Sequence, residues 1–166
     1  MTKDFFQHRF DNVEDYLHHR PPYLMVEEIV AITDEEIRTS KTVPGQDGFL
    51  KGHFPGAAVF PGAMMQELVT QSAGILIAAN YNPMKEYNTA DPHFNEYALG
   101  VLIKVQEARY RGFARPGDRL DVEVKLNEIV DSLLQFSGKI TVDGRQIMRI
   151  QFLLSNIKSS LLTGNS

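Results

Sequence analysis

The sequence predicts an α+β fold in which a curved antiparallel sheet wraps around one long central helix. Residues 63–80 form a segment of helical length that is apolar nearly all round, which is typical of a buried helix. Several apolar segments separated by turn residues predict strands, without the strand–helix–strand alternation of a parallel sheet. The 166 residues have the length of one domain, which we place at 1–158, followed by a flexible tail at 159–166.

The predicted elements follow in a simple order along the chain. A short helix at 11–17 ends before two prolines, because proline cannot continue a helix. After two strands and a loop rich in glycine and proline comes the helix at 63–80, about 27 Å long at about 1.5 Å per residue. A polar, aromatic loop at 80–96 leads to four more strands, the last two joined by the hairpin signal Asp143-Gly144. The predicted strands are 23–32, 37–43, 97–110, 119–130, 133–142 and 146–157.

Composition and charge exclude several classes of protein. The net charge of −4 at pH 7 argues against a general nucleic-acid surface, which would be basic. The chain has no cysteine, which excludes a disulfide framework, a cysteine-based zinc site and a cysteine nucleophile. The longest apolar run, around 74–79, is too short to cross a bilayer, and the N-terminus lacks the apolar core of a signal peptide. We therefore expect a cytoplasmic protein that binds neither membranes nor nucleic acid.

The start of the predicted helix carries a candidate site. Gly62 and Ala63 open the helix, where the first N–H groups have no internal partner and carry the positive end of the helix dipole. These groups suit a carbonyl oxygen that gains negative charge. Glu67 follows in the second turn, and Gln71 lies one turn beyond it, where it can orient the carboxylate. Burial would make Glu67 a proton donor, whereas a carboxylate that simply faces solvent is the alternative.

His53 lies in the motif GHFPG, shortly before the helix. Imidazole is the side chain that changes its charge closest to neutral pH, which suits proton transfer. A loop histidine bonded to backbone is the alternative. A base, an acid and a helix N-terminus within one short stretch favour proton abstraction beside a carbonyl group with loss of a leaving group. His18 and His19 are adjacent and point apart without a third ligand nearby, so we expect no metal site.

At these residues the sequence resembles a known family. The segment GHFPGAAVFPGAMMQELVTQ, residues 52–71, is very similar to the active-site segment of the 3-hydroxyacyl-[acyl-carrier-protein] dehydratases of fatty acid synthesis, the FabZ/FabA type. The resemblance extends to HRPPYLMVEEIV at 19–30 and ARYRGFARPGD at 108–118, and covers most of the chain. It implies a hot-dog fold, an antiparallel sheet wrapped around one long helix, in agreement with the order of elements above.

The resemblance also assigns roles to residues. In that family the motif histidine and an acidic residue fourteen positions later form the catalytic pair, which corresponds here to His53 and Glu67. The N–H at the helix start, here Gly62, binds the thioester carbonyl, and the family glutamine corresponds to Gln71. Glutamate at 67 resembles the FabZ branch. The resemblance further implies a homodimer or a trimer of dimers, in which each site pairs the histidine of one subunit with the acid of the other.

The reaction implied by the resemblance is dehydration of (3R)-hydroxyacyl thioesters on acyl carrier protein to trans-2-enoyl thioesters. It needs no cofactor, which suits a chain without a Rossmann glycine pattern or a P-loop. Ala58 stands where the family usually has proline, and Gly112-Phe113 replaces a basic residue and proline. The aromatic loop at 80–96 is a candidate lid. These departures bear on the substrate rather than on the reaction.

A basic stretch is a candidate docking surface for the acidic carrier protein. The segment 104–119 contains five lysine and arginine residues and two acidic residues, which gives it a local charge of +3. Arg109 and Arg115 are our candidates for steering the carrier and its phosphate to the site. A solvated strand edge, where basic residues block aggregation, is an equal alternative.

Two other functions stay open. A hot-dog thioesterase would share the fold and the binding of thioesters but would deliver water to the carbonyl carbon, and the GHFPG motif argues against it. A non-catalytic acyl-binding or assembly subunit would bind without turnover. The presence of both His53 and Glu67 argues against that function.

Overall fold

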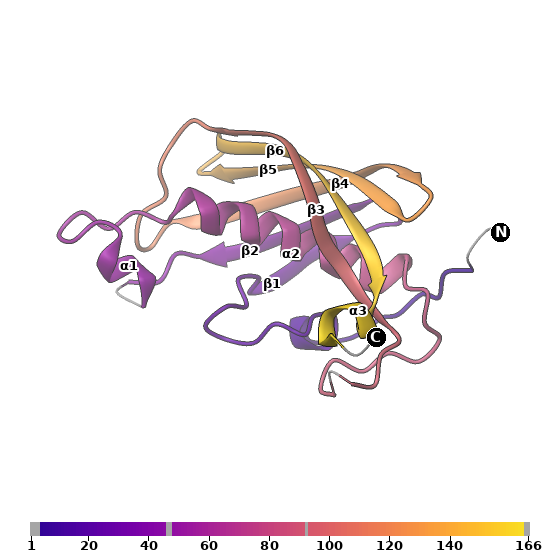
Figure 1. Ribbon diagram of the computed structural model, residues 1–166. Helices are drawn as coiled ribbons and strands as arrows, with labels where there is room; N and C mark the ends of the chain where they lie inside the picture. The colour runs from indigo at the N-terminus through magenta and orange to yellow at the C-terminus, as the bar shows by residue number, and fades with distance from the viewer. Residues whose placement is uncertain (1–3, 46–47, 92, 165–166) are drawn as a thin grey trace.

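Six strands form one antiparallel sheet that curves around a central helix, α2 (Gly62–Asn80), in the computed structural model (Figure 1). The structure describes residues 4–45, 48–91 and 93–164. The strand order is β1-β2-β4-β5-β6-β3, so β1 and β3 are the edges of the sheet. The predicted hot-dog architecture is confirmed. The strands are β1 (Glu28–Ile32), β2 (Glu36–Thr42), β3 (Tyr97–Tyr110), β4 (Arg119–Val130), β5 (Leu133–Val142) and β6 (Arg145–Lys158).

Three short helical segments complete the described chain. They are the 3-10 turn η1 (Val13–Asp15), the helix α1 (Phe49–Gly52) and the C-terminal helix α3 (Ser159–Thr163). The helix predicted at 11–17 is thus reduced to one turn. The prediction of a flexible tail at 159–166 needs a correction, because its first five residues form α3. No helix of the described chain has both the length and the apolar character that a membrane span requires.

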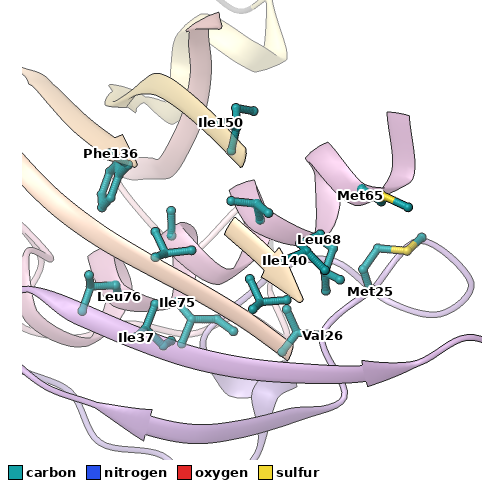
Figure 2. Close-up of a cluster of buried hydrophobic side chains, with 14 of the residues drawn as sticks. Met25, Val26, Ile37, Met65, Leu68, Ile75, Leu76, Phe136, Ile140 and Ile150 are labelled. Atoms are coloured by element: carbon teal, nitrogen blue, oxygen red, sulfur yellow. The ribbon is translucent and has the colours of Figure 1, made fainter. Parts of the chain in front are cut away.

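The core lies between the inner face of the sheet and α2 (Figure 2). In β4 every second side chain is buried from Leu120 to Leu126, as expected for a strand with one covered face. On α2, nearly every residue from Leu68 to Asn80 is buried, which confirms the helix predicted from its lack of a polar face. Gly138 of β5 lets the sheet approach α2 closely, since a Cβ atom there would lie 2.4 Å from Val69.

The last four strands lie within one residue of their predicted bounds, and Asp143 and Gly144 both have the positive φ that a two-residue hairpin turn requires. The first predicted strand, 23–32, is wrong for its first half, because β1 begins at Glu28. Two sets of hydrogen bonds explain the difference. Gln71 binds the Tyr23 carbonyl and the Met25 N–H, and the Arg20 carbonyl accepts the Tyr23 and Leu24 N–H groups, so these backbone groups are not available to β2.

Candidate active site

Glu67 lies in the second turn of α2 and lines a cleft of about 480 Å³ between this helix and β3. Its side chain is 21% exposed. The larger part of the cleft surface is apolar, and several of the polar side chains that line it lie close to Glu67. The lining residues come from the N-terminal segment, α2, the first half of β3 and α3: Leu17, His18, His19, Tyr23, Glu67, Thr70, Gln71, Gly74, Ala98, Leu99, Gly100, Val101, Leu102, Ser159, Leu162 and Thr163. This arrangement resembles a pocket for a ligand with an apolar body and one polar end.

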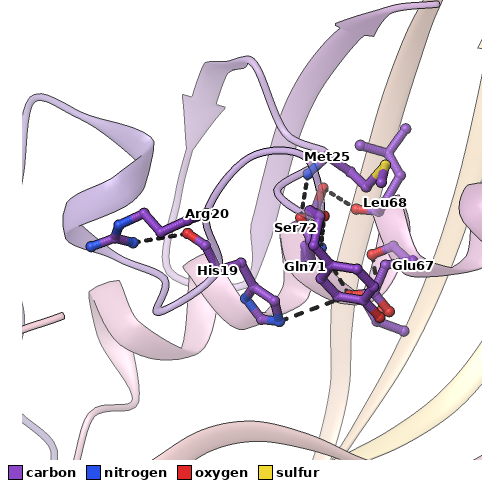
Figure 3. Close-up of polar contacts among 9 residues, drawn as sticks. His19, Arg20, Met25, Glu67, Leu68, Gln71 and Ser72 are labelled. Atoms are coloured by element: carbon purple, nitrogen blue, oxygen red, sulfur yellow. Dashed lines mark hydrogen bonds and ion pairs between the residues drawn. The ribbon is translucent and has the colours of Figure 1, made fainter. Parts of the chain in front are cut away.

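Gln71 holds the Glu67 carboxylate from one turn further along the helix (Figure 3). Its Nε2 donates to Glu67 Oε1 at 2.8 Å and to the carbonyl oxygen of Tyr23 at 3.0 Å. Its Oε1 accepts the Met25 N–H at 2.7 Å. Because Met25 N–H can only donate, the amide oxygen must face it and the amide nitrogen must face the carboxylate. Gln71 is therefore fixed in one amide orientation, with its nitrogen toward Glu67.

Sequence reasoning missed two neighbours of Glu67. His19 Nε2 lies 3.9 Å from Glu67 Oε1 (Figure 3). The His19 ring stacks on Tyr23 with ring centroids 5.6 Å apart. Burial lowers the pKa of His19, and the nearby Glu67 charge partly opposes this shift. Burial and the same carboxylate raise the pKa of Tyr23. Their membership of the segment HRPPYL, which resembles the family, is the signal that points to both residues.

His53 follows α1 and is held in one tautomer. Its Nδ1 lies 3.0 Å from the carbonyl oxygen of Val59, and its own carbonyl accepts the Val59 N–H at 3.1 Å. A carbonyl oxygen can only accept, so Nδ1 carries the hydrogen. The lone pair of Nε2 on the half-buried ring therefore remains available to accept a proton.

Gly62 and Ala63 begin α2 as predicted, directly after Pro61. The Met64 N–H donates to the Pro61 carbonyl at 3.0 Å, so the amides of Gly62 and Ala63 precede the first bonded turn. The ring of Tyr110 lies so close to Gly62 that a Cβ atom there would be 3.1 Å from the ring. Burial raises the pKa of Tyr110. At the start of α2, backbone N–H groups therefore lie close to the aromatic ring of Tyr110, with little space between them.

The described residues of one chain do not bring His53 and Glu67 together. His53 and Gly62 are absent from the lining of the cleft, and His53 contacts the loop at Val59 rather than any residue near the carboxylate. The acid with its orienting glutamine and the histidine thus form two separate parts of the predicted site.

The candidate lid at 80–96 does not reach the cleft with any of its described residues. Its side chains are bonded to the N-terminal segment instead: Tyr87 Oη donates to the Tyr16 carbonyl at 2.9 Å, and Thr89 Oγ1 to the Glu14 carbonyl at 2.6 Å. Within one chain the loop therefore stays behind the cleft wall, and the lid stays a prediction. Residues of α3 line the cleft.

The two candidate docking arginines differ in their surroundings. Arg109 pairs with Glu107, which also lies 3.4 Å from Arg149. The Arg115 guanidinium lies 5.7 Å from the ring centre of Phe113, which is 62% exposed. Arg115 therefore presents a cation beside an exposed aromatic ring, whereas the charge of Arg109 is already paired.

A second hollow, of about 340 Å³, lies over the sheet and is lined by charged, polar and apolar residues of β2, β3, β4, β5 and β6. It contains none of the predicted site residues. Among the described residues, no three histidine or acidic side chains gather in a way that would hold a metal ion.

Comparisons with known proteins agree with this geometry. Residues 17–151 match the family model of the FabA-like domain. The chain is 32% identical to the 3-hydroxyacyl-[acyl-carrier-protein] dehydratase FabZ of Coxiella burnetii, over 86% of this chain and 94% of that protein. It is 30% identical to the FabZ of Dichelobacter nodosus, over 88% and 94% of the two chains.

Solved structures show the same fold at lower identity. The dehydratase heterocomplex ApeI:P from Xenorhabdus doucetiae matches with a TM-score of 0.72 and 20% identity, over 94% of this chain and 97% of that chain. A hypothetical thioesterase from Streptococcus pneumoniae matches with a TM-score of 0.58 and 16% identity, over 79% and 85%. At such identities the likeness concerns the fold alone. The family match and the two FabZ relatives go further, and the chain belongs to the FabA-like family.

Proposed function

We propose that this protein dehydrates (3R)-hydroxyacyl thioesters on acyl carrier protein to trans-2-enoyl thioesters, in fatty acid biosynthesis or a related lipid or polyketide pathway. The observation that carries the proposal is the Glu67 carboxylate, held by Gln71 at the wall of a largely apolar cleft. An apolar cleft with a few convergent polar groups suits an acyl chain with a reacting polar end. The names of the curated relatives support acyl carrier protein as the carrier. A cytoplasmic location is part of the same proposal.

The reaction follows from the two proton-transfer groups. His53 Nε2 takes a proton from the carbon next to the thioester carbonyl, and the electron pair of that C–H bond forms the new double bond. The bond to the 3-hydroxyl group breaks, and Glu67 supplies the proton with which this group leaves as water. Gly62 and Ala63 N–H stabilise the thioester oxygen, which gains negative charge as the proton is removed. Every step uses side chains and amides, so the reaction needs no cofactor.

The site requires two chains. Because His53 and Glu67 do not meet within one chain, we place Glu67 of one chain opposite His53 of the partner subunit. The edge strand β3 supports this arrangement, because its outer side is unpaired in the described sheet and it exposes Leu102 and Ile103. Two copies that pair along β3 would cover this edge. The proposal therefore includes a homodimer, alone or within a trimer of dimers.

The carrier protein is proposed to dock near Arg115 and Phe113. An acidic carrier with a phosphate on its pantetheine arm would be attracted by an exposed guanidinium group. Arg109 is the weaker of the two candidates because Glu107 already pairs with it.

Turnover of 3-hydroxyacyl and 2-enoyl thioesters tests the proposed function. The parent protein should interconvert the two acyl forms, and His53→Ala and Glu67→Gln should each lose most of this rate while remaining folded. Release of free thiol would show a thioesterase instead. Binding of the thioesters with no turnover of either form would show a non-catalytic acyl-binding protein.

A further inference from the structure

Two hydrogen bonds fix the C-terminal helix α3 to the segment that precedes β3. The Ser159 N–H donates to the Glu96 carbonyl at 2.8 Å, and Ser159 Oγ donates to the Asn95 carbonyl at 2.7 Å. Figure 1 shows α3 beside the first residues of β3. These bonds hold the helix against the rest of the domain.

α3 and Glu67 line the same cleft, and contacts along α2 and β3 separate them. Glu67 and Gly74 both line it and are seven residues apart on α2, about 10 Å along the helix axis. Gly74 lies against Gly100 near the start of β3, where a Cβ atom on Gly100 would be 3.2 Å from the Gly74 Cα. The start of β3 pairs with the end of β6 through Tyr97 and Lys158, and α3 begins at the next residue.

The wall between Glu67 and α3 is mainly apolar. Leucine and valine side chains line it, together with the two glycines at which α2 and β3 touch. The apolar lining residues along this path are Leu17, Ala98, Leu99, Val101 and Leu102, and α3 adds Leu162. A thioester whose reacting carbons lie at Glu67 would thus extend its hydrocarbon tail toward α3, because the apolar wall leads there.

We propose that Leu162 forms the end wall of this acyl-binding cleft and thereby sets the longest acyl chain that the protein accepts. The proposal rests on the proposed function, since it assumes that the acyl chain of the substrate occupies the cleft. Leu162 is 60% exposed in the free chain, so a long acyl tail that reaches it would remove its apolar surface from water.

The neighbouring leucine provides a matched control. Leu161 is 72% exposed and does not line the cleft, although it lies on the same helix. Adjacent residues of a helix point in different directions, so the same substitution at 161 changes size and hydrophobicity on α3 without changing the end wall.

The test is a chain-length profile of kcat/KM for 3-hydroxyacyl thioesters from short to long, measured on the parent, Leu162→Trp, Leu162→Ala and Leu161→Trp. Leu162→Trp should lower the ratio of long-chain to short-chain kcat/KM by about tenfold or more. A hydrophobic pocket discriminates between substrates that differ by one methylene group by about this factor. Leu162→Ala should raise the ratio. Leu161→Trp should leave it unchanged, and circular dichroism would check that all variants fold.

Two results would overturn the inference while the proposed function stands. One is an unchanged chain-length ratio in both Leu162 variants of an active enzyme. The other is an equal change in Leu161→Trp and Leu162→Trp. If the parent turns over no thioester, the proposed function fails. Calorimetric measurement of the binding of saturated acyl thioesters then tests the end wall at Leu162 by itself. Equal chain-length limits for parent and Leu162→Trp would reject the end wall, and a shorter limit for Leu162→Trp would support it.

Discussion

Gln71 donates a hydrogen bond from Nε2 to Oε1 of Glu67 at 2.8 Å, from one turn further along the same helix. The other end of the same amide accepts the Met25 N–H at 2.7 Å. One buried side chain thus connects the proposed acid to the N-terminal segment that forms part of the cleft. A change at position 71 should therefore affect both activity and stability.

Gln71→Leu should destabilise the fold and slow the reaction. Loss of the amide leaves the Met25 N–H buried without its acceptor, which typically costs about 1–3 kcal/mol. The free energy of unfolding, from urea denaturation, should fall by that amount. kcat should fall as well, because the carboxylate loses the group that orients it.

Gln66→Leu is the control for this variant. Gln66 lies on the same helix, and its side chain forms no hydrogen bond within the described part of the chain. This variant should keep the kcat and the unfolding free energy of the parent nearly unchanged. An equal loss of stability in both variants would mean that the effect comes from the change of residue type and not from the bonds of Gln71.

Two inactive variants should restore activity when they are combined. If each site uses Glu67 of one chain and His53 of the partner subunit, a mixed dimer of His53→Ala and Glu67→Gln contains one intact site. Unfolding and refolding the two variants together at equal amounts should restore about a quarter of the parent rate, because half of the dimers are mixed. No recovery, despite mixed dimers detected by native mass spectrometry, would place both groups within one chain.

Gly62→Pro tests the backbone donor at the start of α2. Gly62 is the first residue of the helix, a position at which proline is tolerated, and Pro61 before it is already extended at ψ 140°. Proline removes the N–H without ending the helix. kcat should fall by about 10²–10³-fold, the usual cost of one oxyanion donor.

Gly62→Ala separates the loss of the donor from crowding. It keeps the N–H and adds only the Cβ atom, which must displace the Tyr110 ring slightly. We expect a much smaller loss of kcat than for proline. If alanine and proline lower kcat equally, crowding against Tyr110 is the cause and the amide is not the donor.

Acid should destabilise the protein through His18 and His19. Burial lowers the pKa of both below their ordinary value of 6.5. As the pH falls below about 6.5, these two histidines bind protons more readily in the unfolded chain than in the folded chain. The free energy of unfolding therefore decreases below that pH, whereas above it the full stability is retained. The His18 ring is also bonded through Nε2 to the Asn95 amide at 3.1 Å, which requires an unprotonated nitrogen.

The double variant His18→Asn, His19→Asn should reduce this acid-side loss. Unfolding free energies measured between pH 7.5 and pH 5 would show a flatter profile for it than for the parent. His93→Asn, at an exposed position, should keep the slope of the parent. A double variant whose slope matches that of the parent would assign the acid sensitivity to other groups.

Arg115→Ala should weaken use of the carrier protein more than use of a small thioester. The exposed Arg115 contributes charge to docking, so its loss should raise KM for acyl carrier protein substrates, most strongly at low salt. kcat/KM for short pantetheine thioesters should stay unchanged. Arg109→Ala is the comparison, with a smaller expected effect because Glu107 pairs with that arginine. Equal KM values for parent and Arg115→Ala would remove this arginine from the docking surface.

Much of the fold was predictable because its signals are local. The apolar circumference of α2 and the alternation in β4, β5 and β6 follow from residue periodicity, so their bounds lie within one residue of the prediction. The segment at 23–27 was not predictable in this way. Its apolar residues have strand propensity, but the Gln71 side chain, more than forty residues away, binds the Tyr23 carbonyl and the Met25 N–H.

The motif from His53 to Gln71 indicated a candidate acid, base and helix start within one short segment, and the resemblance to the dehydratase family was needed to assign their roles. Which groups surround them depended on tertiary structure. His19 contacts Glu67, and α3 lines the same cleft as Glu67, although these residues are distant in sequence. His53, which is close to Glu67 in sequence, does not line this cleft. Such contacts depend on how the sheet curves around α2, and no local pattern of residues encodes that geometry.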